Sequence, residues 1–198
     1  IISQTGNIYN LVHEKKRAWH AGVSYWSQFT DINSLSLGIE LDYSKNKKNN
    51  QFSAIMIKSL QILLKKLKNK YNIKNENILG HSDIAPFRKI DPGPKFPWKK
   101  INSYDFSIKK NFKIDFAVRN LKNWFIKNKI KSSKNTALFI LSFIGYDVSK
   151  TKKNRKLLKK LIFAYQSHYL QSNFNGKLDE KTLNCLFIHF YNILLTNN

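Results

Sequence analysis

The sequence predicts an α/β protein in which a mixed central sheet is flanked by helices and followed by a small C-terminal domain of three-helix type. Residues 35–42 alternate strictly between apolar and polar side chains, which is typical of a strand with one buried face. Residues 52–71 place apolar side chains at three- and four-residue spacing, which is typical of an amphipathic helix. A strand followed by a helix and another strand favours a sheet covered by helices.

The first predicted element is a hairpin at the start of the chain. Ile1-Ile2 and the mostly apolar residues 8–12 flank Thr5-Gly6-Asn7, a turn signal. Residues 17–30 are rich in polar and aromatic side chains and are expected to form a loop that leads into the strand at 35–42.

Two strands of the predicted sheet lead to polar side chains. In the strand at 35–42, the alternation turns Glu40 away from the apolar face. Residues 78–81 predict a second short strand, which runs directly into a proline-rich loop. Because ligand sites are common where strands of an α/β sheet end, this loop is the expected place for a site.

All four prolines of the chain lie between Pro86 and Pro97. Proline fixes φ and removes a backbone donor, so this segment is expected to be a rigid, irregular loop. The loop carries His81, Lys89 and Asp91. A histidine nitrogen and a carboxylate oxygen are suitable zinc ligands. The alternative is a histidine bonded to backbone, an aspartate that forms a turn, and one of many surface lysines.

The second half of the chain predicts a separate helical domain. Its apolar pattern favours four helices, at residues 116–130, 136–144, 156–170 and 180–195. The boundary is expected near residues 101–112, which divides the chain into domains at 1–105 and 112–198.

Composition limits the possible classes of function. The 198 residues carry a net charge of +23, but only four of the 35 basic side chains are arginines. Nucleic-acid readers favour arginine forks, so we interpret the charge as a general compositional bias and expect no nucleic-acid partner. Cys185 is the single cysteine and lies among apolar residues, which predicts a buried structural thiol. No apolar run is long enough to span a bilayer.

Three blocks of sequence resemble one enzyme family. They are Arg17-Ala18-Trp19-His20-Ala21-Gly22-Val23-Ser24, Ser36-Leu37-Gly38-Ile39-Glu40, and the loop Gly80-His81-Ser82-Asp83-Ile84-Ala85-Pro86 with Arg88-Lys89 and Asp91-Pro92-Gly93-Pro94. In this order they resemble the zinc-dependent N-acetylmuramoyl-L-alanine amidases of the AmpD/AmiD (amidase-2) type, which share their fold with peptidoglycan recognition proteins. Residues 163–166 and 176–182 are similar, more weakly, to a peptidoglycan-binding three-helix domain.

The resemblance implies a catalytic site. It places Zn²⁺ on His81 and Asp91, with a third ligand, a histidine, expected upstream of Ile1. Glu40 matches the catalytic glutamate that takes a proton from water and passes it to the leaving amine. Lys89 would stabilise the oxyanion.

Three further residues match the family: two lie in the block that lines the substrate groove, and one lies in the signature loop. Trp19, His20 and Arg88 are therefore expected to bind substrate, and for Trp19 ordinary core packing is the alternative. The implied substrate is peptidoglycan or a muropeptide, cleaved between N-acetylmuramic acid and L-alanine during cell-wall turnover.

The resemblance also implies a location and leaves one alternative open. We expect a monomer in the periplasm or associated with the outer membrane or cell envelope, in preference to the cytoplasm. The chain starts without methionine or a signal peptide, which suggests a fragment or a processed product. If the missing histidine has no counterpart, the alternative is a non-catalytic peptidoglycan-binding protein with a degenerate amidase fold.

Overall fold

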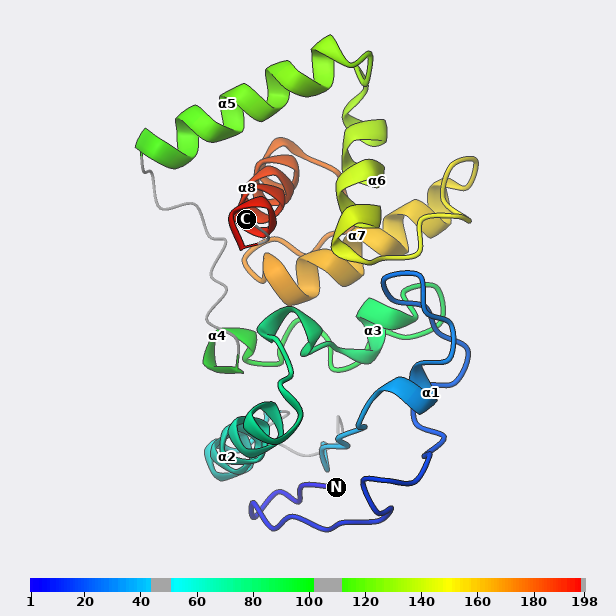
Figure 1. Ribbon diagram of the computed structural model, residues 1–198, viewed down its shortest axis with the longest axis vertical. Coiled ribbons are helices and arrows are strands. Elements are labelled where there is room, and N and C mark those ends of the chain that lie inside the picture. Colours follow the sequence, from blue (N-terminus) through cyan, green and yellow to red (C-terminus); the bar gives the residue numbers. More distant parts are fainter. Residues whose placement is uncertain (44–50, 102–111, 197–198) are drawn as a thin grey trace.

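The computed structural model describes residues 1–43, 51–101 and 112–196. Its helices form two parts that lie one above the other in Figure 1, with α3 and α4 facing α7 across their boundary. None of the helices in these three ranges combines the length and the apolar character needed to cross a membrane. The helices are α1 (Ile32–Leu35), α2 (Ala54–Tyr71), α3 (His81–Ile84), α4 (Trp98–Ile101), α5 (Phe112–Lys127), α6 (Ser133–Ile144), α7 (Arg155–Tyr169) and α8 (Glu180–Thr196), with a 3₁₀ turn at Asn75–Asn77.

The predicted mixed central sheet is wrong for the described residues. Extended backbone is present, but it forms only isolated bridges, which join Ile2 to Ile8, Ile2 to Leu41, and Trp26 to Phe29. Around the predicted strand at 35–42, the amide of Ile2 donates to the carbonyl of Glu40 at 2.8 Å and the amide of Asp42 donates to Ile2 at 2.9 Å. This contact is too short to be a ladder.

The predicted strand at 78–81 is also wrong, and its donors explain why. The amide of Ile78 donates to the Asn75 carbonyl at 3.1 Å, which closes the 3₁₀ turn. The amide of Gly80 donates to Oδ2 of Asp83 at 2.7 Å, and His81 begins helix α3. Alternation identifies the face of a strand but not its partner, and here local turns and caps use the donors that a ladder would need.

The predicted hairpin at the start of the chain is confirmed. The amide of Ser3 donates to Asn7 at 2.9 Å, and the amide of Tyr9 donates to Ile1 at 2.8 Å. The pair of Ile2 and Ile8 lies between these bonds as an antiparallel bridge. Ile2 is almost fully buried, so this turn fixes the chain against α2.

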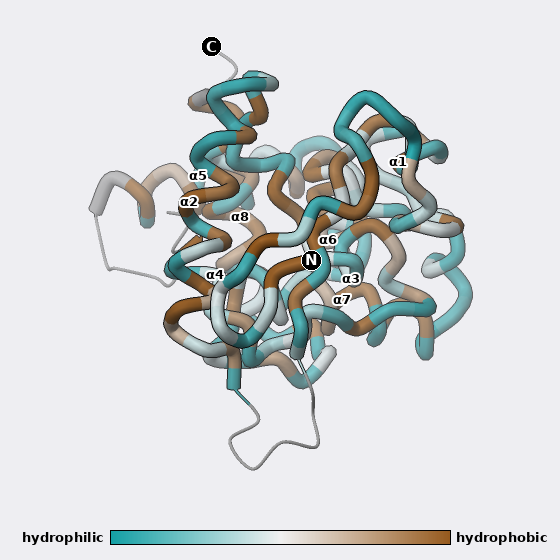
Figure 2. The backbone as a smooth tube through the Cα atoms, turned by 90° about the horizontal axis from the view of Figure 1, so that it is seen from below, coloured by the Kyte–Doolittle hydropathy of each residue, from teal (hydrophilic) through white to brown (hydrophobic). Residues whose placement is uncertain are grey.

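Helix α2 confirms the prediction at 52–71. Teal and brown alternate along it in Figure 2, as expected for an amphipathic helix. It begins after Ser53, whose hydroxyl accepts the amide of Met56 at 3.1 Å. Its buried face, which includes Met56, Leu60 and Leu67, packs in a small cluster with Phe96 and Trp98.

The four predicted helices of the second half are confirmed as α5 to α8, with ends that shift by a few residues. Helix α8 packs against α5 and α6, and Cys185 is fully buried in it, as predicted. The core of this half also includes Trp26 and Ile84 from the first half, so one cluster of buried side chains crosses between the two parts. Most of the predicted boundary at 101–112 lies outside the described residues.

Candidate active site

The loop residues His81 and Asp91 lie side by side. Nδ1 of His81 is 3.1 Å from Oδ2 of Asp91, and the amide of Ser82 donates to the Asp91 carbonyl at 2.9 Å. The hydrogen bond to His81 holds the pKa of Asp91 below its ordinary value, although partial burial acts in the opposite direction. The nine residues between the pair therefore fold back so that both side chains meet at one point.

The second nitrogen of His81 faces the other loop that resembles the family. Nε2 is 3.1 Å from the carbonyl oxygen of Ala21 and 3.3 Å from Nη2 of Arg88. Two arrangements of the neutral ring satisfy these contacts. Either Nδ1–H donates to Asp91 while Nε2 accepts from Arg88, or Nε2–H donates to Ala21. The second arrangement turns the lone pair of Nδ1 toward the Asp91 carboxylate, where a cation would be bound.

Arg88 fastens the loop at residues 21–23 to this pair. Its Nε donates to the Val23 carbonyl at 3.0 Å, and its Nη2 donates to the Ala21 carbonyl. A side chain on Gly22 would place its Cβ 2.8 Å from Nη2 of Arg88, and Gly22 has a φ of +59°. Glycine is therefore required where the guanidinium crosses this backbone. The Arg88 contact spans more than sixty residues, so no local pattern in the sequence predicts it.

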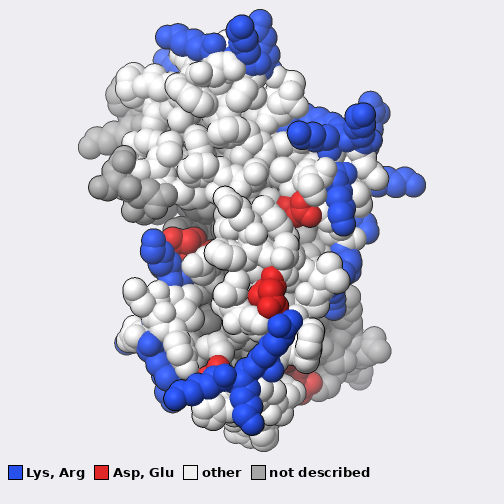
Figure 3. Space-filling model, turned by 45° about the vertical axis from the view of Figure 1, so that its right-hand side comes forward, with Lys and Arg blue, Asp and Glu red and all other residues white. Residues whose placement is uncertain are grey.

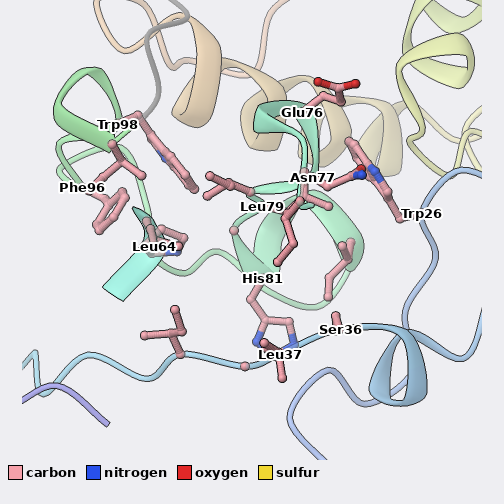
Figure 4. Close-up of a pocket in the computed structure, with 18 of the residues that line it drawn as sticks. Trp26, Ser36, Leu37, Leu64, Glu76, Asn77, Leu79, His81, Phe96 and Trp98 are labelled. Carbon is pink, nitrogen blue, oxygen red and sulfur yellow. The ribbon is translucent and has the colours of Figure 1, made fainter. Parts of the chain in front are cut away.

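Glu40 and the His81–Asp91 pair line one large cavity of about 1310 Å³. Figure 4 shows His81 between α3 and the segment that bears Ser36 and Leu37. The Glu40 side chain is exposed and lies on that same segment, whose backbone is fixed by Ile2. The sequence prediction that Glu40 faces away from the apolar side chains agrees with this position. The structure thus places Glu40, His81 and Asp91 on the lining of one cavity, with His81 and Asp91 in direct contact.

His20 also lines the cavity, whereas Trp19 and Lys89 do not belong to its lining. Nε2 of His20 is 3.4 Å from the Ser36 hydroxyl, and a Cβ on Gly38 would lie 2.5 Å from the His20 ring. Trp19 is 81% exposed beneath the guanidinium of Arg17, which lies 4.2 Å from its ring centre. Core packing of Trp19, the alternative drawn from sequence, is therefore wrong.

The separation of His81 and Asp91 suits two ligands of one metal ion. Nitrogen and oxygen ligands of one tetrahedral zinc lie roughly 3.3 Å apart, as bond lengths of about 2.0–2.1 Å require. The 3.1 Å between His81 and Asp91 is close to this value. The Ala21 carbonyl also provides the outer partner that a ligating histidine usually has. The pair fits two positions of a zinc site, and no third histidine, cysteine, aspartate or glutamate joins it among the described residues.

The sequence did not assign a role to the buried residues behind the site. Asp83, inside the signature loop, is fully buried and bonds to Tyr146 and His168 of the helical half. The sequence signal that could have indicated this role is an aspartate followed by apolar residues. A carboxylate that becomes buried is normally paired with another polar group.

The second, weaker motif forms a closed turn before α8. Gln166 donates to the Lys177 carbonyl at 3.0 Å and accepts the amide of Gly176 at 2.7 Å. Asp179 accepts the amide of Thr182 at 2.8 Å and so caps the first turn of α8. The motif residues therefore shape one turn.

Comparison with known proteins agrees with this geometry. Residues 1–94 match the family model described as N-acetylmuramoyl-L-alanine amidase. The chain is 33% identical to the N-acetylmuramoyl-L-alanine amidase AmiD of Escherichia coli over 184 residues, which cover 88% of this chain and 64% of that protein. It is 37% identical to the 1,6-anhydro-N-acetylmuramyl-L-alanine amidase AmpD of Enterobacter cloacae, over 52% of this chain and 54% of that protein. The chain thus spans less than two thirds of the length of these curated relatives.

Solved structures give the same assignment. The complex of Escherichia coli AmiD with anhydro-N-acetylmuramic acid-L-Ala-D-γ-Glu-L-Lys has a TM-score of 0.74 and 30% identity, and covers 92% of this chain and 71% of that one. Pseudomonas aeruginosa AmpDh3 has a TM-score of 0.73 and 30% identity, over 90% and 70% of the two chains. Alike in sequence and in fold, the chain belongs to the N-acetylmuramoyl-L-alanine amidase family.

Proposed function

We propose that the protein hydrolyses the amide between N-acetylmuramic acid and L-alanine in peptidoglycan or its muropeptides, in cell-wall turnover. The observation that carries the proposal is that Glu40 lines the same cavity as the adjacent His81 and Asp91. The substrate class follows from the family and from the AmiD structure, which contains a muropeptide.

Zn²⁺ is the proposed cofactor. His81 and Asp91 would hold it, together with a third donor from outside the described residues. Bound zinc polarises an amide carbonyl and lowers the pKa of a bound water to about 7. His81 would act in the form whose Nε2–H donates to Ala21, so Arg88 and the loop at 21–23 hold the ring in its ligating orientation.

The remaining roles belong to the chain's own side chains. Glu40 would accept a proton from the attacking water and return it to the L-alanine amine, which avoids expulsion of an amide anion. Lys89 lies two residues before Asp91 and would turn toward the cavity to stabilise the developing oxyanion as a point charge. Trp19 and His20 would contact the substrate at the cavity edge, whereas Arg88 would contribute by fixing the loop they belong to.

Replacement of Glu40 tests the proposal. Glu40→Gln in the full-length, zinc-loaded protein is expected to lower kcat for release of the stem peptide by roughly two to four orders of magnitude, because a general base is lost. Muropeptide binding should change little. Peptide release is measured by chromatography, and binding by calorimetry.

Asp42→Asn is the matched control for this experiment. Asp42 lies two residues further along the same segment, is exposed, and is absent from the cavity lining. Its replacement should leave the rate unchanged. An undiminished rate for Glu40→Gln would exclude Glu40 as the base.

The alternative from the sequence is a non-catalytic peptidoglycan-binding protein. The lack of a third metal donor among the described residues favours it. In that case the parent protein would bind muropeptides without releasing any peptide, with or without zinc. The position of Glu40 on the cavity that His81 and Asp91 also line favours the enzyme, because binding alone requires no general base there.

We further propose that residues 112–198 form a wall-binding domain and that the protein acts as a monomer in the periplasm or at the outer membrane. The closed turn formed by Gln166 and Asp179 supports this domain assignment. On the face shown in Figure 3, lysines and arginines form separate groups at the top, along one side and toward the bottom. A scattered distribution of this kind suits general attraction to anionic polymers better than a nucleic-acid groove.

A further inference from the structure

The loop that carries His81 and Asp91 depends on hydrogen bonds from the helical half of the molecule. Prolines lack an amide donor, and all four prolines of the chain lie between Pro86 and Pro97. A loop of this composition has few amide donors for its own carbonyl groups, so donors from elsewhere in the chain have acceptors to bind there. The helical half provides donors at both ends of the loop.

At the first end, Asp83 is bound by two side chains of the helical half. Its Oδ1 accepts the Tyr146 hydroxyl at 2.5 Å, and its Oδ2 is 2.8 Å from Nδ1 of His168. Asp83 is fully buried, and Tyr146 and His168 are at most 5% exposed. The same Oδ2 caps the first turn of α3 through the amide of Gly80. Since α3 begins at His81, these contacts fix the backbone from which the His81 side chain projects.

Aromatic packing fixes the orientation of His168. Its ring stacks on Trp98 at 3.6 Å between centres and on Tyr169 at 3.9 Å. Gly80 lies against this group, since a Cβ placed on it would be 3.1 Å from the Trp98 ring. The histidine is therefore held rigidly where it meets Asp83.

At the other end, donors from α7 and the segment after it reach loop carbonyls. Nε2 of Gln171 donates to the carbonyls of Pro94 and Phe96 at 2.7 and 2.6 Å. Nζ of Lys160 donates to the Phe87 carbonyl at 2.9 Å. Together with the bonds at Asp83, these contacts hold the loop on both sides of Asp91.

We infer that the helical half is a clamp that positions the His81–Asp91 pair, with Tyr146, His168 and Gln171 as its positioning residues. The inference rests on the proposed function, since the pair is the one we assign to zinc. It adds to that function a role for the helical half that is separate from wall binding: without these donors, the two ligands lose their fixed separation.

Hydrogen–deuterium exchange of the full-length protein tests the clamp without requiring activity. Tyr146→Phe removes one hydroxyl and leaves Asp83 Oδ1 without that donor. Amide exchange in residues 80–96 should accelerate by roughly 10- to 100-fold, as the loss of a bond to a buried charge implies. Zinc affinity, measured against a chromophoric chelator, should fall, and kcat should fall while KM stays unchanged.

Tyr165→Phe is the matched control. Tyr165 is equally buried in the same half, but its hydroxyl lies 3.5 Å from Sγ of Cys185 and 3.4 Å from Nδ1 of His189. The Tyr165→Phe substitution should destabilise the helices without accelerating amide exchange in residues 80–96. Gln171→Ala, at the other end of the loop, is the second test variant and should accelerate exchange around residues 94–96.

The outcomes separate the clamp from the proposed function. Equal loop exchange in Tyr146→Phe and Tyr165→Phe, or unchanged exchange in Tyr146→Phe and Gln171→Ala, would overturn the clamp even if the wild type is an active amidase. Selective acceleration supports the clamp. If this acceleration appears while the wild type releases no peptide, the proposed function is wrong but the clamp is supported.

Discussion

His81 is the residue on which the proposed chemistry depends, because both of its ring nitrogens already have partners. Nδ1 faces Asp91 and Nε2 faces Ala21 and Arg88. Zinc at Nδ1 would replace the direct contact to Asp91 and keep the bond to Ala21. The protein therefore does not need to rearrange the ring to bind a metal, only to exchange one hydrogen bond for a bond to the ion.

Replacement of His81 tests this arrangement. His81→Asn is expected to lower zinc affinity by at least the roughly 10- to 100-fold that loss of an outer-sphere partner costs. The measurement is a competition titration against a chromophoric chelator at neutral pH. His13→Asn is the control, because the His13 side chain is exposed, does not line the cavity, and accepts the amide of Lys15 at Nδ1. Equal zinc affinity of the two variants would remove His81 from the metal site.

Helix α2 is the element that forms one wall of the cavity, through Leu60, Leu64 and Leu67. Its start is fixed twice by Ser53. The hydroxyl accepts the amide of Met56 at 3.1 Å and donates to the Gln4 carbonyl at 2.6 Å. The N-cap therefore also ties the helix to the opening hairpin.

Ser53→Ala should lower the free energy of unfolding by about 0.5–2 kcal/mol, the usual cost of a lost N-cap. Ser59→Ala, inside the same helix, is the control and should be neutral or slightly stabilising, since alanine is the better helix former. Urea unfolding followed by circular dichroism measures both. A cost for Ser59→Ala as large as for Ser53→Ala would show that the hydroxyl of Ser53 is not the cause.

The elements also show what the sequence could predict. Helices α2 and α5 to α8 follow from apolar spacing, which is a local property. The sheet could not be predicted correctly, because within the described ranges Leu41 pairs only with Ile2 and the amides of Ile78 and Gly80 are used locally. The His81–Asp91 pair was suggested by family resemblance. The contacts of Arg88 and Asp83 were not, because they join residues more than sixty positions apart.

At the scale of the whole molecule, the stability of the fold depends on pH through one buried histidine of α8, His189. His189 is 4% exposed, and burial, helped by the nearby His168, lowers its pKa from 6.5 to about 3. The folded protein thus keeps His189 neutral over a range in which the unfolded chain binds a proton. Its contribution to stability is complete above pH 6.5 and is lost as the pH falls toward 3.

This difference predicts that the free energy of unfolding falls between pH 6.5 and 4.5 by up to about 1.4 kcal/mol per pH unit. His189→Phe removes the titrating ring and should flatten this dependence, whereas His13→Asn should retain it. Urea titrations at a series of pH values provide the slopes. Identical slopes for the wild type and His189→Phe would assign the acid sensitivity to other groups.

The bonds that Tyr146, His168 and Gln171 make to the proline-rich loop have a consequence for inheritance. A wall-binding module joined to a catalytic unit by a linker can be exchanged between genes without harm. Here a recombination event near residue 107 would separate the loop from its donors. We therefore expect the two halves to be inherited together. A hybrid protein with the helical half of another protein would need an equivalent tyrosine, histidine and glutamine to hold the loop.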